Sequence, residues 1–293
     1  MSTSGTGLVF NPMPNLMAQI LYSGFTKEKM LRFTFNLILL LSAIPISRAQ
    51  IGSLLFKDSI RINSGTVHLD QMNHIYAISS DGSRLISYHG DLRVRREISS
   101  PFISELMSLD VHDTEKLYLF NPEISSVQSL DENLETIADD YYPELNAESA
   151  FCYFGPNRYA FFANQRVHIR DIRDQSIRSG IELVTSRRKG GPVSQMSSDG
   201  ISIYLLIPGT GLWIFNESLQ EKKHLEDSAI LQMDFLEGSL YYLKNNIIYE
   251  WKPEGKGIRE IYRGTEKILD FALNRDYFVL ALPGRIKRFQ IYR

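Results

Sequence analysis

The sequence has little of what marks a disulfide scaffold, a metal cluster or a common hydrolase site. It holds one cysteine, Cys152, among 293 residues, and a single thiol cannot form an intramolecular disulfide. Its six histidines are scattered, without the close spacing of a zinc site or a His-Glu-x-x-His pattern. It has no Gly-x-Ser-x-Gly elbow, and its glycine pairs lack the lysine of a phosphate-binding loop. We therefore expect a fold that is held by packing alone, with Cys152 as a small core residue.

An excess of charge of one sign is also missing. The chain carries 32 basic and 34 acidic residues, and 43% of its residues are hydrophobic, which is ordinary for a soluble globular domain. This balance does not indicate a partner such as nucleic acid or an anionic membrane surface. The length suits one large all-β domain that needs no disulfide or metal for stability.

The first fifty residues differ from the rest because they have the pattern of an export signal. Arg32 precedes an apolar stretch centred on residues 37–41, and Ser47 and Ala49 place small side chains where signal peptidase cleaves, before Gln50. The apolar run is shorter than the roughly 20 residues that cross a bilayer, so residues 30–49 are predicted to be a signal peptide. The alternatives are an uncleaved anchor and a buried helix. Residues 1–29 are interpreted as a disordered or wrongly assigned start, and the mature protein as periplasmic or secreted.

The remaining chain, residues 50–293, is a repeat. An aromatic residue recurs in a short apolar run six times, at spacings of 42, 41, 45, 38 and 36 residues. A period near forty with several strand-like runs is typical of the blades of a β-propeller. The six aromatic residues are Tyr76, Tyr118, Tyr159, Tyr204, Tyr242 and Phe278.

Five repeats contain four strand-like runs each, whereas the last contains three. The spare run at residues 54–62 is predicted to pair outside residues 286–291 and to close a six-bladed propeller, which removes two exposed sheet edges. The alternatives are five blades, seven blades or a β-sandwich. Inner strands are predicted at residues 67–69, 107–111, 150–154, 193–196, 231–235 and 268–272.

An acid follows the inner strand at what looks like a fixed place in four repeats, as Asp70, Asp110, Asp234 and Asp270. Capping of a turn by the Asp side chain explains this pattern, and the alternative is a metal site near the axis. Together with the unit LDQMNHIYAISSDGSRLISYHGDL at residues 69–92, the pattern resembles the repeats of NHL and TolB-like propellers. The resemblance covers residues 51–293 and implies six blades.

Three long connections between blades, residues 99–105, 138–149 and 185–192, are expected to cluster on one side of a face. The second is acidic and aromatic and the third is basic, so we hypothesise a surface for partner binding, with two solvated loops that neutralise each other as the alternative. The candidate binding residues are Asp139, Asp140, Tyr141, Tyr142, Arg187, Arg188 and Lys189.

These observations favour an exported, non-catalytic propeller that acts as a binding or assembly scaffold. We expect a protein or envelope component as partner, no nucleic acid, membrane contact only through an uncleaved leader, and a monomer. No cofactor, metal ligand or catalytic residue is assigned. The alternative is a metal-dependent propeller enzyme of the lactonase or lyase type, with its site in the central channel.

Overall fold

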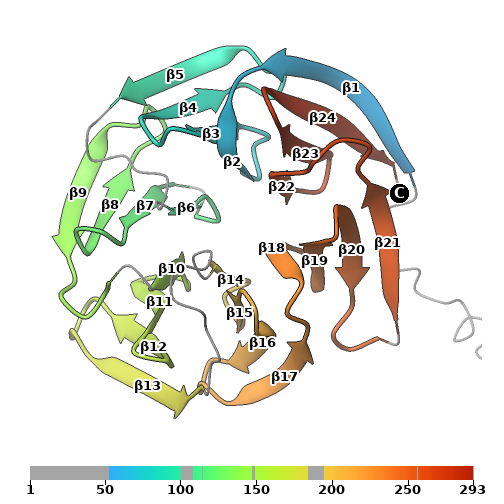
Figure 1. Cartoon of the computed structure of the whole chain (residues 1–293). Helices are drawn as coiled ribbons and strands as arrows, with labels where there is room; N and C mark the ends of the chain where they lie inside the picture. The colour runs from blue at the N-terminus through green and yellow to red at the C-terminus, as the bar shows by residue number, and fades with distance from the viewer. Residues whose placement is uncertain are drawn as a thin grey trace, which may run out of the picture. The chain divides into compact units, whose positions relative to one another are not determined.

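The computed structural model describes residues 53–99, 108–113, 115–146, 149–183, 195–255 and 257–292. Within these ranges the regular elements are β-strands, which form six four-stranded antiparallel sheets. The sheets are arranged as blades around a central axis (Figure 1). The prediction of an all-β, six-bladed propeller is therefore confirmed. Among these residues there is no helix that could cross a membrane, and the predicted leader lies outside the described residues.

Each blade runs from an inner strand at the axis to an outer strand at the rim. The inner strands are β2 (Ser64–Leu69), β6 (Ser108–Asp110), β10 (Ala150–Tyr153), β14 (Gln195–Ser198), β18 (Ile230–Leu236) and β22 (Asp270–Leu273). The second strands are β3 (Ile75–Ser79), β7 (Leu117–Asn121), β11 (Arg158–Ala163), β15 (Ser202–Ile207), β19 (Ser239–Lys244) and β23 (Tyr277–Leu282). The third strands are β4 (Arg84–Tyr88), β8 (Ser126–Leu130), β12 (Arg166–Asp171), β16 (Gly211–Asn216), β20 (Ile247–Trp251) and β24 (Arg285–Tyr292). The outer strands are β5 (Val94–Ser99), β9 (Thr136–Tyr141), β13 (Ile177–Glu182), β17 (Glu221–Glu226), β21 (Ile258–Arg263) and β1 (Ser53–Arg61).

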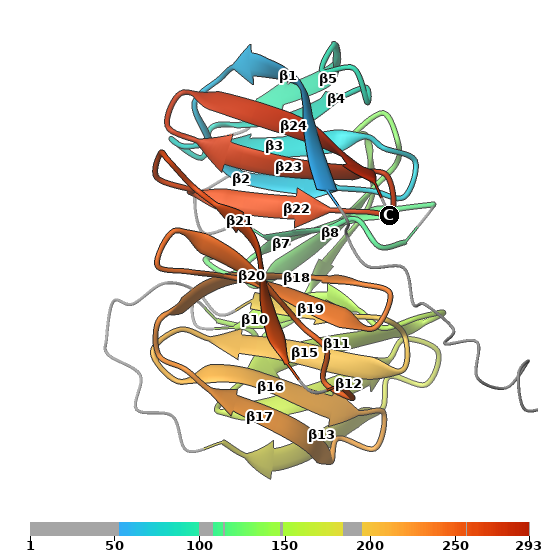
Figure 2. The ribbon, with the colours of Figure 1, turned by 90° about the vertical axis from the view of Figure 1, so that its right-hand side faces the viewer.

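The first and last strands of the described chain close the ring. β1 pairs antiparallel with β24, with Leu54 opposite Ile291 and Ile60 opposite Ile286. Figure 2 shows β1 along the outside of β24, in the same blade as β22 and β23. This is the pairing that the missing strand of the last repeat predicts. It gives β24 a partner on both sides, so the sheet edge at the chain's end is covered.

The hydrophobic core is divided among the blade interfaces. Six buried clusters are present in the described chain, and each takes its side chains from two neighbouring blades. Second strands such as β3 and β7 are buried along their whole length because both of their faces are covered by neighbouring blades. Cys152 is completely buried between the third and fourth blades, as predicted.

The end of the second blade differs from the prediction. Its outer strand was expected to stop at Ile137, and residue 138 to start a long loop. Instead β9 continues to Tyr141, which pairs with Ser126 on β8. The cross-strand ladder therefore extends over residues whose charge and aromatic content suggested a loop, because strand formation here depends on pairing with β8 rather than on local composition.

Candidate functional site

The inner strands enclose a central channel. Its cavity has a volume of about 620 Å³ and is lined by residues from all six blades. Apolar walls come from side chains such as Val67, Met233 and Phe271, whereas Asp110, Asp234 and further titratable side chains of the inner strands and of the turns after them add polarity. His68, His112 and Asp270 line its inner part, and Asp199, Glu237, Arg275 and Asp276 line it at the turns after the inner strands. An apolar cavity with a few converging polar groups is the typical form of a small-molecule site.

Three channel carboxylates each join one blade to the next. Each accepts a hydrogen bond from a backbone N–H of the following blade, at 2.8 to 2.9 Å. The Gln195 Oε1 atom accepts the Met233 N–H in the same way, at 3.0 Å. The three carboxylate contacts join Asp110 to Tyr153, Asp234 to Leu273 and Asp270 to Val67.

These acids do not occupy a fixed place in the repeat, so that part of the sequence interpretation is wrong. Asp110 ends its inner strand opposite Tyr118, whereas Asp234 lies inside β18 and Asp270 begins β22. Bulges and different strand lengths shift the register between blades, and the sequence pattern did not indicate these shifts. The acids share a role in blade-to-blade bonding rather than a common turn position.

The Asp110 carboxylate forms an ion pair with His112, with 2.9 Å between Oδ1 and Nδ1. Burial alone would lower the pKa of His112, but the Asp110 carboxylate outweighs it and raises this pKa to about 9. Burial would likewise raise the pKa of Asp110, but His112 holds it below its ordinary value. The pair is therefore ionised at neutral pH.

Among the described residues, no cationic side chain is hydrogen-bonded to Asp234 or Asp270, and both accept from backbone N–H groups. Burial raises the pKa of Asp234 to about 6, against the nearby charge of His112 and two backbone N–H groups, and raises that of Asp270 to about 7, against two backbone N–H groups. Burial lowers the pKa of His68 to about 4, which leaves its imidazole neutral at pH 7. The channel thus holds more negative than positive charge.

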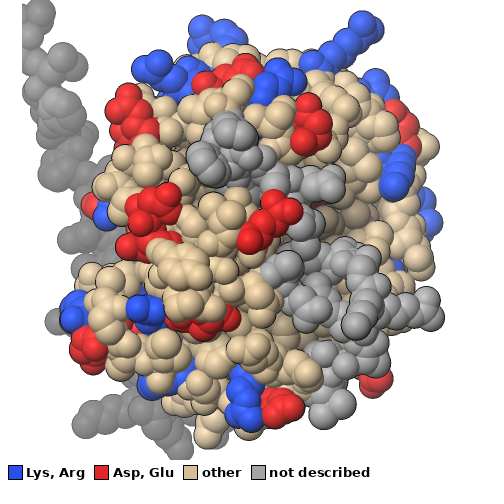
Figure 3. Space-filling model, turned by 60° about the vertical axis from the view of Figure 1, so that its left-hand side comes forward, with Lys and Arg blue, Asp and Glu red and all other residues tan. Residues whose placement is uncertain are grey.

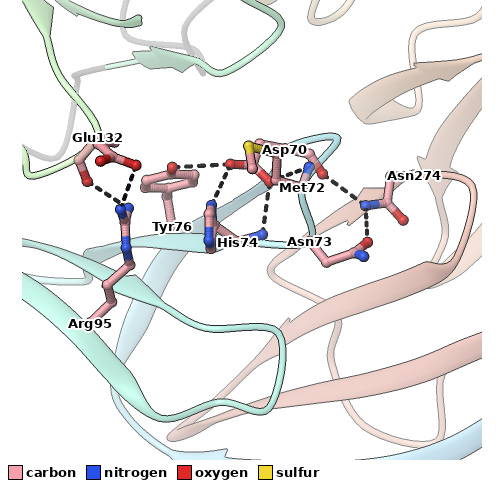
Figure 4. A network of polar contacts seen from close by, with 8 residues as sticks. All are labelled: Asp70, Met72, Asn73, His74, Tyr76, Arg95, Glu132 and Asn274. Atoms are coloured by element: carbon pink, nitrogen blue, oxygen red, sulfur yellow. Dashed lines mark hydrogen bonds and ion pairs between the residues drawn. The ribbon is translucent and has the colours of Figure 1, made fainter. Parts of the chain in front are cut away.

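Asp70 stands outside this set and caps the turn between β2 and β3 (Figure 4). Its Oδ1 atom accepts the N–H groups of Met72 and His74, both at 2.8 Å. Its Oδ2 atom lies 3.0 Å from the Nδ1 atom of His74 and accepts the Tyr76 hydroxyl at 3.1 Å. Turn capping, the first of the two sequence interpretations, thus describes this acid, and it also describes Asp110, whose Oδ1 atom accepts the His112 N–H at 2.9 Å.

The first blade contacts both neighbouring blades, the sixth through the capped turn and the second through Arg95 on β5 (Figure 4). Asn274 of the sixth blade donates through Nδ2 to the Asp70 carbonyl and to the Asn73 side chain, both at 2.7 Å. On the other side, Arg95 donates to the backbone and carboxylate of Glu132 in the second blade, at 2.6 and 2.9 Å. These contacts join the sixth, first and second blades to one another.

A related contact explains part of the aromatic repeat. In three blades the hydroxyl of the repeating tyrosine donates to an aspartate in the turn before its strand, five or six residues earlier. This spacing is visible in the sequence, but our sequence analysis missed it. The pairs are Tyr76 with Asp70, Tyr118 with Asp113, and Tyr204 with Asp199.

Three of the acidic and aromatic binding candidates lie on a strand and not in the long loop that was predicted for them. Asp139, Asp140 and Tyr141 lie on the rim strand β9, where Asp139 accepts hydrogen bonds from Ser126 and Gln128. Figure 3 brings this side of the molecule forward and shows acidic and basic side chains interspersed over the part that the structure describes. The three basic candidates, Arg187, Arg188 and Lys189, lie outside the described residues.

Tyr142 is buried and packs between the second and third blades. Its ring lies 4.7 Å below the Arg170 guanidinium, which also pairs with Glu144 at 2.7 Å. Tyr141, by contrast, is 69% exposed. Of the two tyrosines proposed as anchors, Tyr141 is accessible to a partner and Tyr142 is part of the core.

No group of three or more His, Cys, Asp or Glu side chains that could hold a metal ion occurs among the described residues. The physical reason lies in the channel, where the oxygens of Asp110, Asp234 and Asp270 are directed to separate backbone N–H groups. A calcium ion needs six or more oxygens at close range, and these residues do not supply such a set.

Comparison with solved structures shows the same fold in proteins of distant sequence. A streptogramin B lyase has a TM-score of 0.56 and 11% identity, covering 82% of this chain and 97% of that chain. Virginiamycin B lyase from Staphylococcus aureus has a TM-score of 0.55 and 13% identity, covering 81% and 100%. A chain of the mitotic checkpoint complex has a TM-score of 0.55 and 8% identity, covering 86% and 98%.

Identities this low show the β-propeller fold and carry no function across. No protein-family model matches the chain, and no curated protein sequence matches it. The chain is thus a six-bladed β-propeller, and the NHL or TolB-like type stays a prediction.

Proposed function

We propose that this protein is an exported, non-catalytic β-propeller that acts as a binding or assembly scaffold in the periplasm or cell envelope. The partner is a protein segment that carries basic groups and docks on the outer strand of the second blade. The leader at residues 30–49 supports export, because its charged start, apolar centre and small residues before Gln50 match a signal peptide.

The observation that carries the proposal is the composition of β9. Ile137 and Tyr141 are 53% and 69% exposed, and the acids Asp139 and Asp140 lie between them on the same strand. An exposed tyrosine gives a large contact area at a small cost in side-chain entropy, and residues of this kind dominate binding energy. The two carboxylates favour a basic partner and oppose pairing of this edge with a second copy.

The channel supports a structural role rather than a catalytic one. Its carboxylates hold adjacent blades together through backbone hydrogen bonds, so removing one would disturb a blade interface. The alternative, a metal-dependent lactonase or lyase, is favoured by the raised pKa values of Asp234 and Asp270, because such shifts are common in active sites. A rise in melting temperature with Ca²⁺ or Mn²⁺ would support that alternative by mass action.

The test compares Tyr141→Ala with Tyr292→Ala in pull-downs from the envelope fraction. Tyr292 is a matched control because it is also an exposed tyrosine, 44% accessible, on the closing blade. We expect Tyr141→Ala to lose a partner that Tyr292→Ala retains. With the purified pair, Tyr141→Ala should weaken binding about thirtyfold, which corresponds to a hot-spot residue.

Retention of the same partners by Tyr141→Ala would contradict the proposed surface. Export is tested separately by the mass of the mature protein, which should begin at Gln50. If the mature chain keeps residues 30–49, the protein is anchored in the membrane and is not secreted.

A further inference from the structure

The central channel holds negative charge that the described residues do not neutralise. His112 forms an ion pair with Asp110 and also attracts the Asp234 carboxylate without a hydrogen bond, so one cation faces two acids. Asp234 and Asp270 accept hydrogen bonds from backbone N–H groups. Each carboxylate has about four acceptor positions, so each of these two keeps capacity for a further donor. Repulsion from Asp234 adds to the raised pKa of Asp270, so the two carboxylates are near enough for one cation to interact with both.

A second observation points independently to a ligand. Ser197 lines the same cavity and is 8% exposed, and its hydroxyl has no hydrogen-bond partner. The Nε2 atom of His68, on another wall, is also buried without a partner. Buried polar atoms are nearly always hydrogen-bonded, so two unpartnered atoms in one cavity indicate a molecule that would bond to them.

The cavity suits an organic cation better than a simple metal ion. Its acids are directed to separate blades, and the described residues offer no cluster that could hold a metal. Its walls include the apolar side chains of Val67, Met233 and Phe271. A volume of about 620 Å³ is within the range of sites for small organic ligands.

We propose that the central channel binds a small organic cation, a protonated amine with an apolar body, through Asp234 and Asp270 with Ser197 as an additional acceptor. The ammonium group donates to the two carboxylates and the Ser197 hydroxyl, and the hydrocarbon part contacts the apolar walls. The proposal does not depend on the partner surface at β9, which lies on the rim.

The mouth of the channel favours the same ligand charge. Asp199 and Asp276 line the cavity at the turns after the inner strands, and Glu237 there pairs with Arg275 at 2.8 Å. The acids outnumber the single arginine, so the entrance attracts cations.

The pH dependence follows from the groups that face the ligand. Between pH 5 and pH 8, Asp234 and Asp270 pass from mostly neutral to mostly ionised, because burial raises their pKa values to about 6 and about 7. Over the same range His112 stays charged, Asp110 stays ionised and His68 stays neutral. Affinity for an amine should therefore rise as the pH increases from 5 to 8.

The experiment is calorimetric titration of the purified full chain with 1,5-diaminopentane at pH 8 and pH 5. Pentane-1,5-diol, of the same length but uncharged, is the control ligand, and CaCl₂ and MgCl₂ are titrated at matched ionic strength. We expect saturable binding of one diamine, weaker binding at pH 5, and no binding of the diol or the metal salts.

Two variants test the position of the site, and a third is the control. Asp234→Asn should weaken the diamine about tenfold, since the negative charge that attracts the ammonium group is lost while an acceptor oxygen stays. Ser197→Ala breaks no hydrogen bond within the described chain, so it should fold normally and still bind severalfold more weakly. Asp174→Asn, at an exposed turn of the third blade, is the control and should bind as the wild type does.

Equal binding of the diamine and the diol, or absence of diamine binding, would overturn the proposal. So would an equal loss in Asp174→Asn, which would indicate general charge attraction. If Ca²⁺ or Mg²⁺ binds stoichiometrically and the diamine cannot displace it, the channel is a metal site and the proposal is wrong. None of these results bears on whether Tyr141 binds a protein partner.

Discussion

Replacing Asp58 by alanine should destabilise the protein more than replacing its ion-pair partner Arg288 by methionine. The two side chains form a two-point contact between β1 and β24, at 2.9 and 2.6 Å, in the blade that closes the ring. Arg288 also lies 4.7 Å above the ring of Tyr277. The contact therefore helps to hold the first strand of the propeller to the last.

The expected asymmetry comes from burial. The Arg288 side chain is 10% exposed and that of Asp58 is 36% exposed. Asp58→Ala leaves a buried guanidinium without its counter-charge, which should cost about 3 kcal/mol in the free energy of unfolding. Arg288→Met keeps an apolar stem on Tyr277 and leaves an aspartate that water can reach, so its cost should be about 1 kcal/mol.

Urea denaturation followed by tryptophan fluorescence at pH 7 measures these differences. In a domain of this size, Asp58→Ala should also lower the melting temperature by about 6–12 °C. The double variant should be more stable than Asp58→Ala alone, since the buried charge has gone with its partner. Arg93→Met is the control, because Arg93 is in an exposed pair with Asp91 and should change stability by about 0.5 kcal/mol or less.

The reasoning would be refuted if Asp58→Ala were no more destabilising than Arg288→Met, or if the two effects simply added in the double variant. Either result would mean that Arg288 is hydrated in the folded protein. In that case the closing blade would be held by its strand pairing and packing alone.

Other consequences concern the channel, one turn and the second blade. The folded pKa of Asp270 lies above its unfolded value, so protons stabilise the fold and this contribution is lost as the pH rises from about 4 to about 7. Denaturation of the wild type and of Asp270→Asn at several pH values measures this effect. The difference between their unfolding free energies, wild type minus variant, should fall as the pH rises through this window, by at most about 1.4 kcal/mol per pH unit. Gly211→Ala should lower the melting temperature strongly, because Gly211 has a φ of 131° and an added Cβ would collide with the Leu225 carbonyl oxygen. Tyr142→Ala should cost about 3 kcal/mol in unfolding free energy, whereas Tyr141→Ala should cost about 0.5 kcal/mol or less, and equal losses in denaturation would contradict the assigned burial.

The two proposed sites occupy separate parts of the molecule and can fail independently. The β9 surface depends on exposed side chains of the rim, and its readout is the loss of a protein partner. The channel site depends on buried groups near the axis, and its readout is the binding of a small amine. A protein that has both would be a scaffold whose central cavity also takes a ligand.

The number of blades and the way the ring closes could be predicted from the repeats in the sequence. The aromatic spacing and the turn residues are local, because each strand and its following turn lie within about ten residues of one another. The count of strands in the last repeat was enough to assign residues 54–62 as the partner of residues 286–291, and the pairing of Leu54 with Ile291 agrees. Burial of Cys152 also followed from its apolar neighbours.

The tertiary structure alone decided what the polar side chains do. Asp110, Asp234 and Asp270 looked equivalent in sequence, but each has its own register and contacts a backbone group of another blade, as far as 203 residues away for Asp270 and Val67. In the same way, neighbouring Tyr141 and Tyr142 have opposite exposures, because the end of β9 turns one outward and the other into the blade interface. Such contacts depend on how the blades are placed beside one another. That placement cannot be predicted from the spacing of residues along the chain.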